Sequence, residues 1–343
     1  MPILLKQVAK KPKLAEIHLR ADYAELLCLL HPDNELSMDD ILSFFTETAD
    51  VDENLEVSED LYISDHDYVE LDQAPKDDLW YGKAREWFIH LQYRQQVFGD
   101  TYPFYLSEKN DVLQLHNNLT RMQKTYLYLL LASNLRCVEK SVSKKLTDSF
   151  EYLAALVTQS YLSSKASVHI FGTSSHIAGG QFSQTTALEK IKELAKQIKE
   201  SVVIPTEDIE HFKNSSGDAG LDIVAWNVFE DNQKGMMLFF GQCACTMDWK
   251  TKQDSSNYAR WRNLLTLSIR PINAIFFPFF YRKNNGQWYN STEFRNSIPI
   301  DRLRIIQLAA KYVDEDVPVF NLDNLPFGIV DEAIVLDSAE LFY

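Results

Sequence analysis

The chain has 343 residues, of which 45% are hydrophobic and 24% charged, and its formal net charge is −15 at pH 7. Its length allows two domains, and its composition is that of a soluble globular protein, which excludes the disordered and fibrous classes. No run of about 18 apolar residues occurs, and the N-terminal segment is too short for a signal-peptide core, so we expect no membrane span and a cytoplasmic location.

The first part of the chain, residues 1–140, is predicted to form a mainly helical domain. Apolar residues recur at helical intervals over residues 15–30, and Ser37 followed by acidic residues has the form of a helix N-cap. The aromatic segment 80–90 and residues 111–134 also have helical spacing. Aromatic residues at that spacing indicate a packed core more than a surface that stacks on bases.

An acidic segment lies within this part of the chain. Residues 47–79 contain thirteen acidic residues and one basic residue, Lys76, so the remainder has 36 acidic and 33 basic residues and is nearly neutral. The segment is interpreted either as a solvated connector or as a surface that docks a basic partner or covers a cleft.

The second part, residues 141–343, is predicted to begin with a helix capped by Thr147 or Asp148, which places Glu151 in its first turns beside apolar residues. A short strand is expected over residues 168–172. After a Gly- and Ser-rich segment, residues 188–200 have the pattern of an amphipathic helix whose Lys and Glu residues face solvent.

A glycine-flanked turn and two strands then form the most informative part of the chain. Residues 217–226 read Gly-Asp-Ala-Gly-Leu-Asp-Ile-Val-Ala-Trp, a turn followed by an apolar strand with Asp222 near its start. Residues 236–240 are apolar, and a polar turn separates the two runs, which predicts a hairpin. If the register brings Gln242 beside Asp222, their oxygens converge as ligands for Mg²⁺.

These residues carry a family resemblance over roughly residues 145–312. The segment 217–226, Gly-Gln-Cys-Ala at 241–244 and Asp-Trp-Lys-Thr-Lys at 248–252 resemble the PD-(D/E)XK superfamily of restriction-endonuclease-like nucleases, and within it a group of uncharacterised bacterial proteins. The resemblance implies an α/β fold with a mixed sheet flanked by helices.

The resemblance also implies roles for individual residues. Asp222, Gln242, the backbone carbonyl of Cys243 and Glu151 would bind Mg²⁺ or Mn²⁺. Ala244 occupies the position of the lysine that helps to activate water in this superfamily. Lys252 or Lys250 would therefore have to take over that function, and the group that this chain resembles has its lysine at the position of Lys252. If neither lysine does so, the site would be inactive.

The segment after the proposed site is basic. Residues 250–304 contain ten Lys or Arg and three acidic residues, which is where a phosphate backbone would bind, with Arg260, Arg262, Arg282 and Lys283 as the expected contacts. A helix is predicted over residues 255–265, a strand over 272–281 and a helix over 301–312.

The leading functional hypothesis is metal-dependent hydrolysis of DNA, and the resemblance implies a role in bacterial defence against phage beside a partner ATPase or helicase. No Gly-x-x-x-x-Gly-Lys motif occurs in the chain, so an ATP-driven step would need such a partner. Two alternatives stay open, a catalytically inactive subunit that binds DNA or a protein, and an ordinary α/β protein. A homo-oligomer is also compatible with the sequence.

Overall fold

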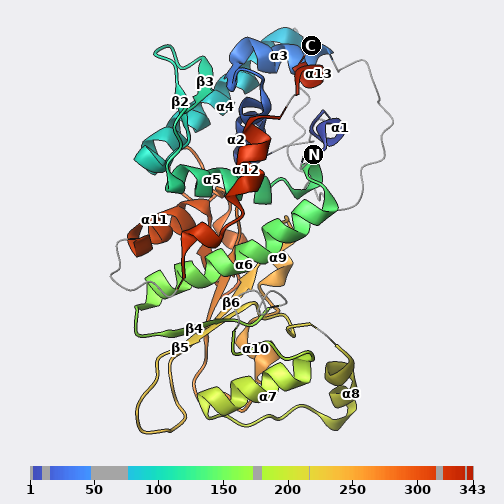
Figure 1. The fold of residues 1–343 in the computed structure, drawn as a ribbon, viewed down its shortest axis with the longest axis vertical. Coiled ribbons are helices and arrows are strands. Elements are labelled where there is room, and N and C mark those ends of the chain that lie inside the picture. The colour runs from blue at the N-terminus through green and yellow to red at the C-terminus, as the bar shows by residue number, and fades with distance from the viewer. Residues whose placement is uncertain are drawn as a thin grey trace. The chain divides into compact units, whose positions relative to one another are not determined.

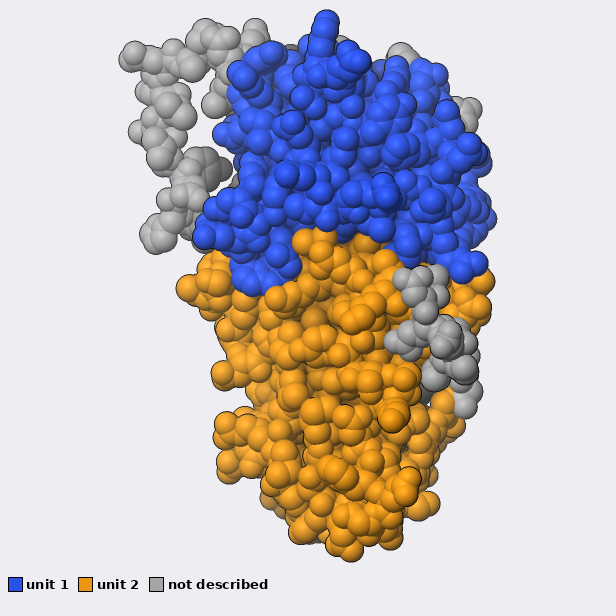
Figure 2. All heavy atoms as spheres, turned by 90° about the vertical axis from the view of Figure 1, so that its left-hand side faces the viewer, with its two compact units in different colours: residues 1–143, 279–289, 326–343 blue, residues 144–278, 290–325 orange. Residues whose placement is uncertain are grey.

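The computed structural model describes residues 3–9, 16–47, 76–172, 180–215, 217–313, 320–336 and 338–342. Most of the acidic segment, residues 48–75, lies outside the described residues. The chain divides into two compact units, shown in Figure 2: unit 1 comprises residues 1–143, 279–289 and 326–343, and unit 2 comprises residues 144–278 and 290–325. Residues 279–289 and 326–343, expected in the second domain, therefore belong to the first unit.

Unit 1 is mainly helical, as expected, and it also contains a small sheet. Its strands β1 (Glu35–Ser37), β3 (Val112–Leu115) and β2 (Phe104–Leu106) pair antiparallel in that order. Its helices are α1 (Leu5–Val8), α2 (Ile17–Leu30), α3 (Met38–Glu47), α4 (Lys76–Phe98), α5 (Arg121–Ala132), α12 (Phe327–Ile334) and α13 (Ala339–Phe342), with short 3₁₀ turns at Gly99–Thr101 and Leu135–Cys137.

Local capping explains where two of these helices begin. Ser37 Oγ accepts a hydrogen bond from Asp40 N at 3.0 Å, while Asp40 Oδ2 accepts one from Ser37 N at 2.7 Å, which fixes the start of α3. Thr120 and Gln123 form the same reciprocal arrangement at the start of α5. The helix predicted from residue 111 is wrong over residues 112–115, because these residues pair with both neighbouring strands instead.

A buried ionic network lies in the core of unit 1. Arg94 from α4 is fully buried, and its Nη1 lies 2.6 Å from Asp22 Oδ1 and 2.8 Å from Glu25 Oε2, both on α2. The hydroxyl groups of Tyr102 and Tyr126 donate to Glu25 Oε1 at 2.7 and 2.9 Å. The network thus joins α2, α4 and α5 through charge as well as through apolar packing.

Unit 2 is a mixed α/β unit. Its five-stranded sheet has the order β4 (Ser167–Ile170), β5 (Ile223–Trp226), β6 (Leu238–Cys243), β7 (Ile272–Phe276) and β8 (Ile298–Ile300). The first two pairings are antiparallel and the last two are parallel. Its helices are α6 (Lys140–Leu162), which begins in unit 1, α7 (Ala187–Ile198), α8 (Thr206–Asn214), α9 (Trp249–Lys252), α10 (Tyr258–Trp261) and α11 (Arg302–Val313), with 3₁₀ turns at Ser291–Glu293 and Leu322–Asn324.

Helices cover both faces of this sheet, as Figure 1 shows for α6 and α7. Val224 and Phe240 are paired across β5 and β6, and they pack with Ile191 and Leu194 of α7 in one buried cluster. Phe239 points the opposite way and its ring contacts Tyr161 of α6. The expectation of an α/β unit with a mixed sheet flanked by helices, after a helical N-terminal region, is therefore confirmed.

Several element boundaries differ from those predicted. The helix expected from residue 147 begins at Lys140, so Glu151 lies near the middle of α6 and not in its first turns. The helix expected over 255–265 is reduced to α10, and the strand expected over 272–281 ends at Phe276. None of the helices in the described ranges is long and apolar enough to cross a membrane.

Candidate functional site

The candidate site is built on the antiparallel pairing of β5 with β6. Ile223 lies opposite Gly241, and one further step along this register places Asp222 opposite Gln242. Asp222 N also donates to Gly241 O at 3.0 Å, so the sheet continues through this position. The two side chains predicted to lie side by side do so, because directly paired residues project from the same face of a sheet.

The contact between these side chains differs from the expected one. Asp222 is 4% exposed, and its Oδ2 accepts hydrogen bonds from Gln242 Nε2 at 2.5 Å and from Cys243 N at 2.7 Å. The amide oxygen of Gln242 accepts instead from Ser255 Oγ at 3.0 Å. The expectation that this oxygen lies beside the carboxylate of Asp222 is therefore wrong for the present structure, since a buried carboxylate oxygen takes hydrogen-bond donors as partners.

Glu151 approaches Asp222 at Gly172, just after β4. A Cβ atom on Gly172 would overlap Glu151 Oε2 and lie 3.0 Å from Asp222 Oδ1. Carboxylate oxygens from α6 and from the start of β5 therefore converge on one backbone position that only glycine can occupy without displacing them.

The surroundings of Asp222, including the nearby Glu151, disfavour its charged form. Burial raises the pKa of Asp222 well above its ordinary value, and the nearby charges of Glu151 and Asp218 raise it further. The Cys243 amide and the Lys252 ammonium oppose the shift without cancelling it. A cation among these oxygens would relieve the repulsion, so the donor set fits a divalent metal.

The number of charged ligands limits how well these residues could bind a divalent metal. Within the described parts of the chain, no group of three or more His, Cys, Asp and Glu side chains is arranged to hold a metal ion. Asp222 and Glu151 would therefore need neutral oxygens to complete a site, and the amide of Gln242 and the carbonyl of Cys243 are the adjacent ones. The Cys243 carbonyl oxygen lies 3.4 Å from Gln242 Nε2.

The two candidate lysines have different surroundings. Lys250 Nζ pairs with Glu293 Oε1 at 2.7 Å, which directs this ammonium group to the 3₁₀ turn that contains Glu293. Lys252 Nζ lies 3.1 Å from Asp248 Oδ2, with its side chain 40% exposed, and its charge lowers the pKa of Asp222. Of these two lysines, Lys252 is therefore the one whose charge acts on Asp222.

A third lysine, Lys190, also belongs to this region, although the sequence pattern placed it on a solvated face. Lys190 is 3% exposed, and its Nζ donates to Phe171 O at 3.0 Å and to Gly172 O at 2.9 Å. The N–H groups of Phe171 and Gly172 donate to Asp222 O at 2.6 and 3.0 Å. The sequence contained one signal for the burial of Lys190. It lies four residues before Leu194, which faces the core, and residues at this spacing share one face of a helix.

Lys190→Met is expected to lower the free energy of unfolding of unit 2 by about 1–3 kcal/mol. The substitution removes the ammonium group that donates hydrogen bonds to the buried main-chain oxygens of Phe171 and Gly172. Lys192→Met is the matched control on the exposed face of the same helix, with an expected change within about 0.5 kcal/mol. Urea denaturation of both variants measures the difference, and equal stabilities would contradict the assigned role of Lys190.

The pKa shift of Asp222 predicts a pH dependence of stability. A carboxyl group whose pKa is raised by folding contributes stability that is present below its unfolded pKa and is lost as pH rises through its folded pKa. Without divalent cations, the wild type should therefore lose stability as pH rises from the unfolded pKa of Asp222 to its higher folded pKa. Asp222→Asn should lose less stability over the same range. Denaturation across a pH series in chelator measures this, with the exposed-acid variant Asp254→Asn expected to follow the wild type.

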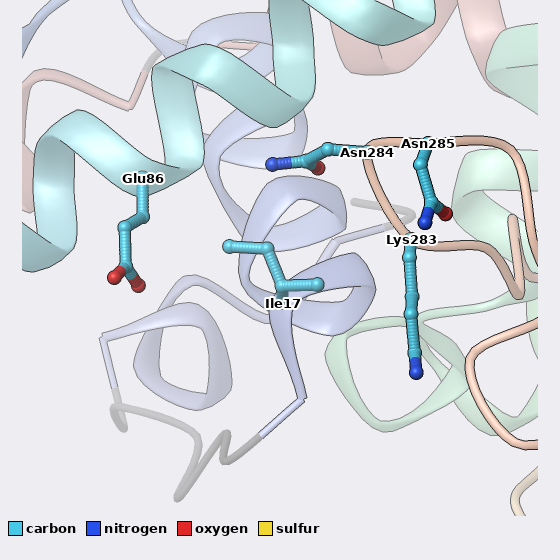
Figure 3. Close-up of a pocket in the computed structure, with 5 residues that line it drawn as sticks. All are labelled: Ile17, Glu86, Lys283, Asn284 and Asn285. Carbon is cyan, nitrogen blue, oxygen red and sulfur yellow. The ribbon is translucent and has the colours of Figure 1, made fainter.

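The predicted basic contacts are divided between the units. Arg260 and Arg262 are exposed in unit 2, and Arg260 Nε donates to Ala219 O at 3.1 Å. Arg282 and Lys283 belong to unit 1, where the Arg282 guanidinium lies 4.3 Å from the centre of the Trp288 ring. Lys283 lines an open pocket with Ile17, Glu86, Asn284 and Asn285, shown in Figure 3.

No family model matches the chain, and comparison with curated proteins and with solved structures gave no match either.

Proposed function

We propose that unit 2 is a divalent-cation-dependent nuclease that hydrolyses DNA phosphodiester bonds. The observation that carries the proposal is the convergence of Asp222 and Glu151 oxygens at Gly172, with Gln242 hydrogen-bonded to Asp222. A buried carboxyl group with a raised pKa, beside a second carboxylate and a lysine, marks a candidate functional site.

The order of elements supports the same proposal. Helix α6 is followed by β4, an insertion with α7 and α8, the β5–β6 hairpin, the short helices α9 and α10, and β7. This is the order expected of a restriction-endonuclease-like core, with the acid at the start of the second of these strands and Gln242 on the third.

The chemistry assigns a role to each residue. Asp222, Glu151, Gln242 and the Cys243 carbonyl would hold Mg²⁺ or Mn²⁺, which supplies Lewis-acid charge neutralisation and lowers the pKa of water. Lys252 would donate a hydrogen bond to the attacking water or to a phosphate oxygen as negative charge develops there. Water adds to phosphorus and the bond to the leaving oxygen breaks, so the products are a phosphomonoester and a hydroxyl group.

DNA is the proposed substrate because basic residues cluster in the segment after the site. Arg260 and Arg262 would contact the phosphate backbone in unit 2, and Arg282 and Lys283 would do so in unit 1. The net charge of −15 opposes non-specific binding of DNA. We therefore include in the proposal a partner ATPase or helicase that delivers DNA, in a cytoplasmic bacterial defence system, and association of the chain with copies of itself.

A second candidate function is a non-catalytic subunit that binds DNA or a partner protein. Two observations favour it: Ala244 stands where the superfamily has its lysine, and the Gln242 amide donates to Asp222 in the position where its oxygen would be needed.

One assay separates the two functions. Purified protein is incubated with linear, circular and single-stranded DNA in Mg²⁺ or Mn²⁺, beside Asp222→Ala and the control Asp254→Ala. Cleavage by the wild type and by the control, with none by Asp222→Ala, is the expected result. Undiminished cleavage by Asp222→Ala refutes the assignment, and binding of DNA without cleavage by the wild type supports the non-catalytic function.

A further inference from the structure

Ser255 lies between the candidate site and the segment that carries Lys252. Its Oγ is 3.0 Å from Gln242 Oε1 and 2.6 Å from the main-chain oxygen of Lys252. Gly220, at φ +78°, permits this approach, because a Cβ atom there would lie 2.6 Å from Ser255 Cβ. The conformation of the Gly-Asp-Ala-Gly turn is thus matched to the position of Ser255.

The hydroxyl of Ser255 has two acceptors within reach and one proton to donate. If the proton goes to Gln242 Oε1, the amide nitrogen of Gln242 faces Asp222, which is the arrangement in this structure. If the proton goes to the Lys252 oxygen, the hydroxyl oxygen becomes an acceptor for the amide nitrogen. The amide can then turn over and present its oxygen on the side of Asp222.

Ser255 Oγ can therefore be either donor or acceptor to the amide, and the two orientations of the amide suit different occupants of the site. With its N–H toward Asp222, the amide donates to the Oδ2 atom of that carboxyl group and needs no cation. An amide oxygen toward Asp222 is repelled by that carboxylate unless a cation lies between them. An acid at position 242 would present oxygens in either orientation and would need no such rearrangement.

We propose that Ser255 is the positioning residue that allows Gln242 to serve as a cation ligand, by accepting the amide N–H when the amide oxygen turns to the cation. The inference rests on the proposed function, because it concerns the same metal site. It explains how a glutamine, whose amide carries a single oxygen, can present that oxygen to a cation.

Neighbouring contacts hold Ser255 in place. Gln253 is buried and donates to the main-chain oxygens of Lys250 and Glu293 at 3.0 and 2.9 Å. Ser256 is buried and donates to Asn273 Oδ1 of β7 at 2.6 Å. With the residues on both sides anchored, Ser255 can exchange its acceptor without movement of the backbone.

The test measures Ca²⁺ affinity by titration calorimetry on the full chain, and so needs no activity. Ser255→Ala should weaken Ca²⁺ binding by about tenfold, the usual scale for loss of a group that orients a metal ligand. Thr251→Ala is the matched control, because the Thr251 hydroxyl also donates to the main-chain oxygen three residues earlier, at 2.9 Å, and is exposed. Its expected effect is below about twofold.

The same substitution is then repeated in a Gln242→Glu background. There the loss caused by Ser255→Ala should fall below about twofold, because a carboxylate needs no reorientation; this coupling is the signature of the proposed role. If Ser255→Ala fails to fold, Ser255→Cys replaces it, since a thiol keeps the side chain's shape but is a weak hydrogen-bonding group.

If Ser255→Ala lowers the Ca²⁺ affinity equally in the wild type and in Gln242→Glu, or lowers it in neither, the proposed role of Ser255 is wrong. The nuclease proposal is not affected by that result. Absence of Ca²⁺ binding by the wild type and by Gln242→Glu overturns both the metal site and this inference. The two failures are therefore distinguishable.

Discussion

Arg94→Met is expected to lower the free energy of unfolding of unit 1 by about 3–5 kcal/mol, the usual loss when one partner of a buried ionic network is removed. The substitution leaves Asp22 and Glu25, which are 2% and 0% exposed, without their shared cation. Although burial alone would lower it, the two carboxylates raise the pKa of Arg94 well above its ordinary value, so this charge is retained in the folded state. Chemical denaturation followed by circular dichroism measures the loss.

Arg85→Met is the control for this experiment, because Arg85 lies on the same helix with an exposed side chain. Its effect should stay within about 0.5 kcal/mol. Adding Asp22→Asn and Glu25→Gln to Arg94→Met should recover part of the stability, since no uncompensated charge then remains buried. A loss no larger than that of Arg85→Met would show that the network does not stabilise unit 1.

Lys252→Met is expected to reduce the rate constant of DNA cleavage by about 10²–10³, the scale for removing one donor that stabilises charge in the transition state. The fold should be little affected, because an exposed pair such as Lys252 with Asp248 contributes about 0–1 kcal/mol. Single-turnover cleavage assays at saturating protein measure the rate constant separately from DNA binding.

Lys250→Met is the matched comparison, two residues away and on the same short helix. Because Lys250 is held by Glu293, this variant should keep most of the wild-type rate. The reverse pattern, with cleavage lost in Lys250→Met and kept in Lys252→Met, would transfer the role to Lys250. Unchanged rates in both variants would leave neither lysine in the chemistry.

The hairpin of β5 and β6 was predictable because its signal is local. Two apolar runs separated by a polar turn specify antiparallel pairing, and the motif residues fix where the acid falls. The register that places Gln242 opposite Asp222 follows from the same pairing. The order of the helices and strands that were predicted in unit 2 was also correct, but α8 and the fifth strand, β8, were not predicted, and boundaries such as the start of α6 moved by several residues.

The remaining features depend on contacts that the sequence does not display. Lys190 can be buried because its ammonium group donates hydrogen bonds to the main-chain oxygens of Phe171 and Gly172, about twenty residues earlier. The orientation of the Gln242 amide depends on Ser255, which lies thirteen residues later. The helical spacing of Lys190 from Leu194 indicates which face of α7 it lies on, but the sequence does not show which atoms accept its hydrogen bonds or those of Ser255. The assignment of residues 279–289 and 326–343 to unit 1 likewise depends on long-range packing.

The division of unit 1 into three stretches of chain has a consequence for its synthesis on the ribosome. Helix α12 belongs to that unit, where Asp331 pairs with Lys124 at 2.6 Å and Val330 and Ala333 are buried. A nascent chain that has reached residue 325 has already made every segment of unit 2, whereas unit 1 still lacks this helix. Unit 1 is therefore completed after unit 2, and its cooperative folding must wait until residues 326–343 have been synthesised.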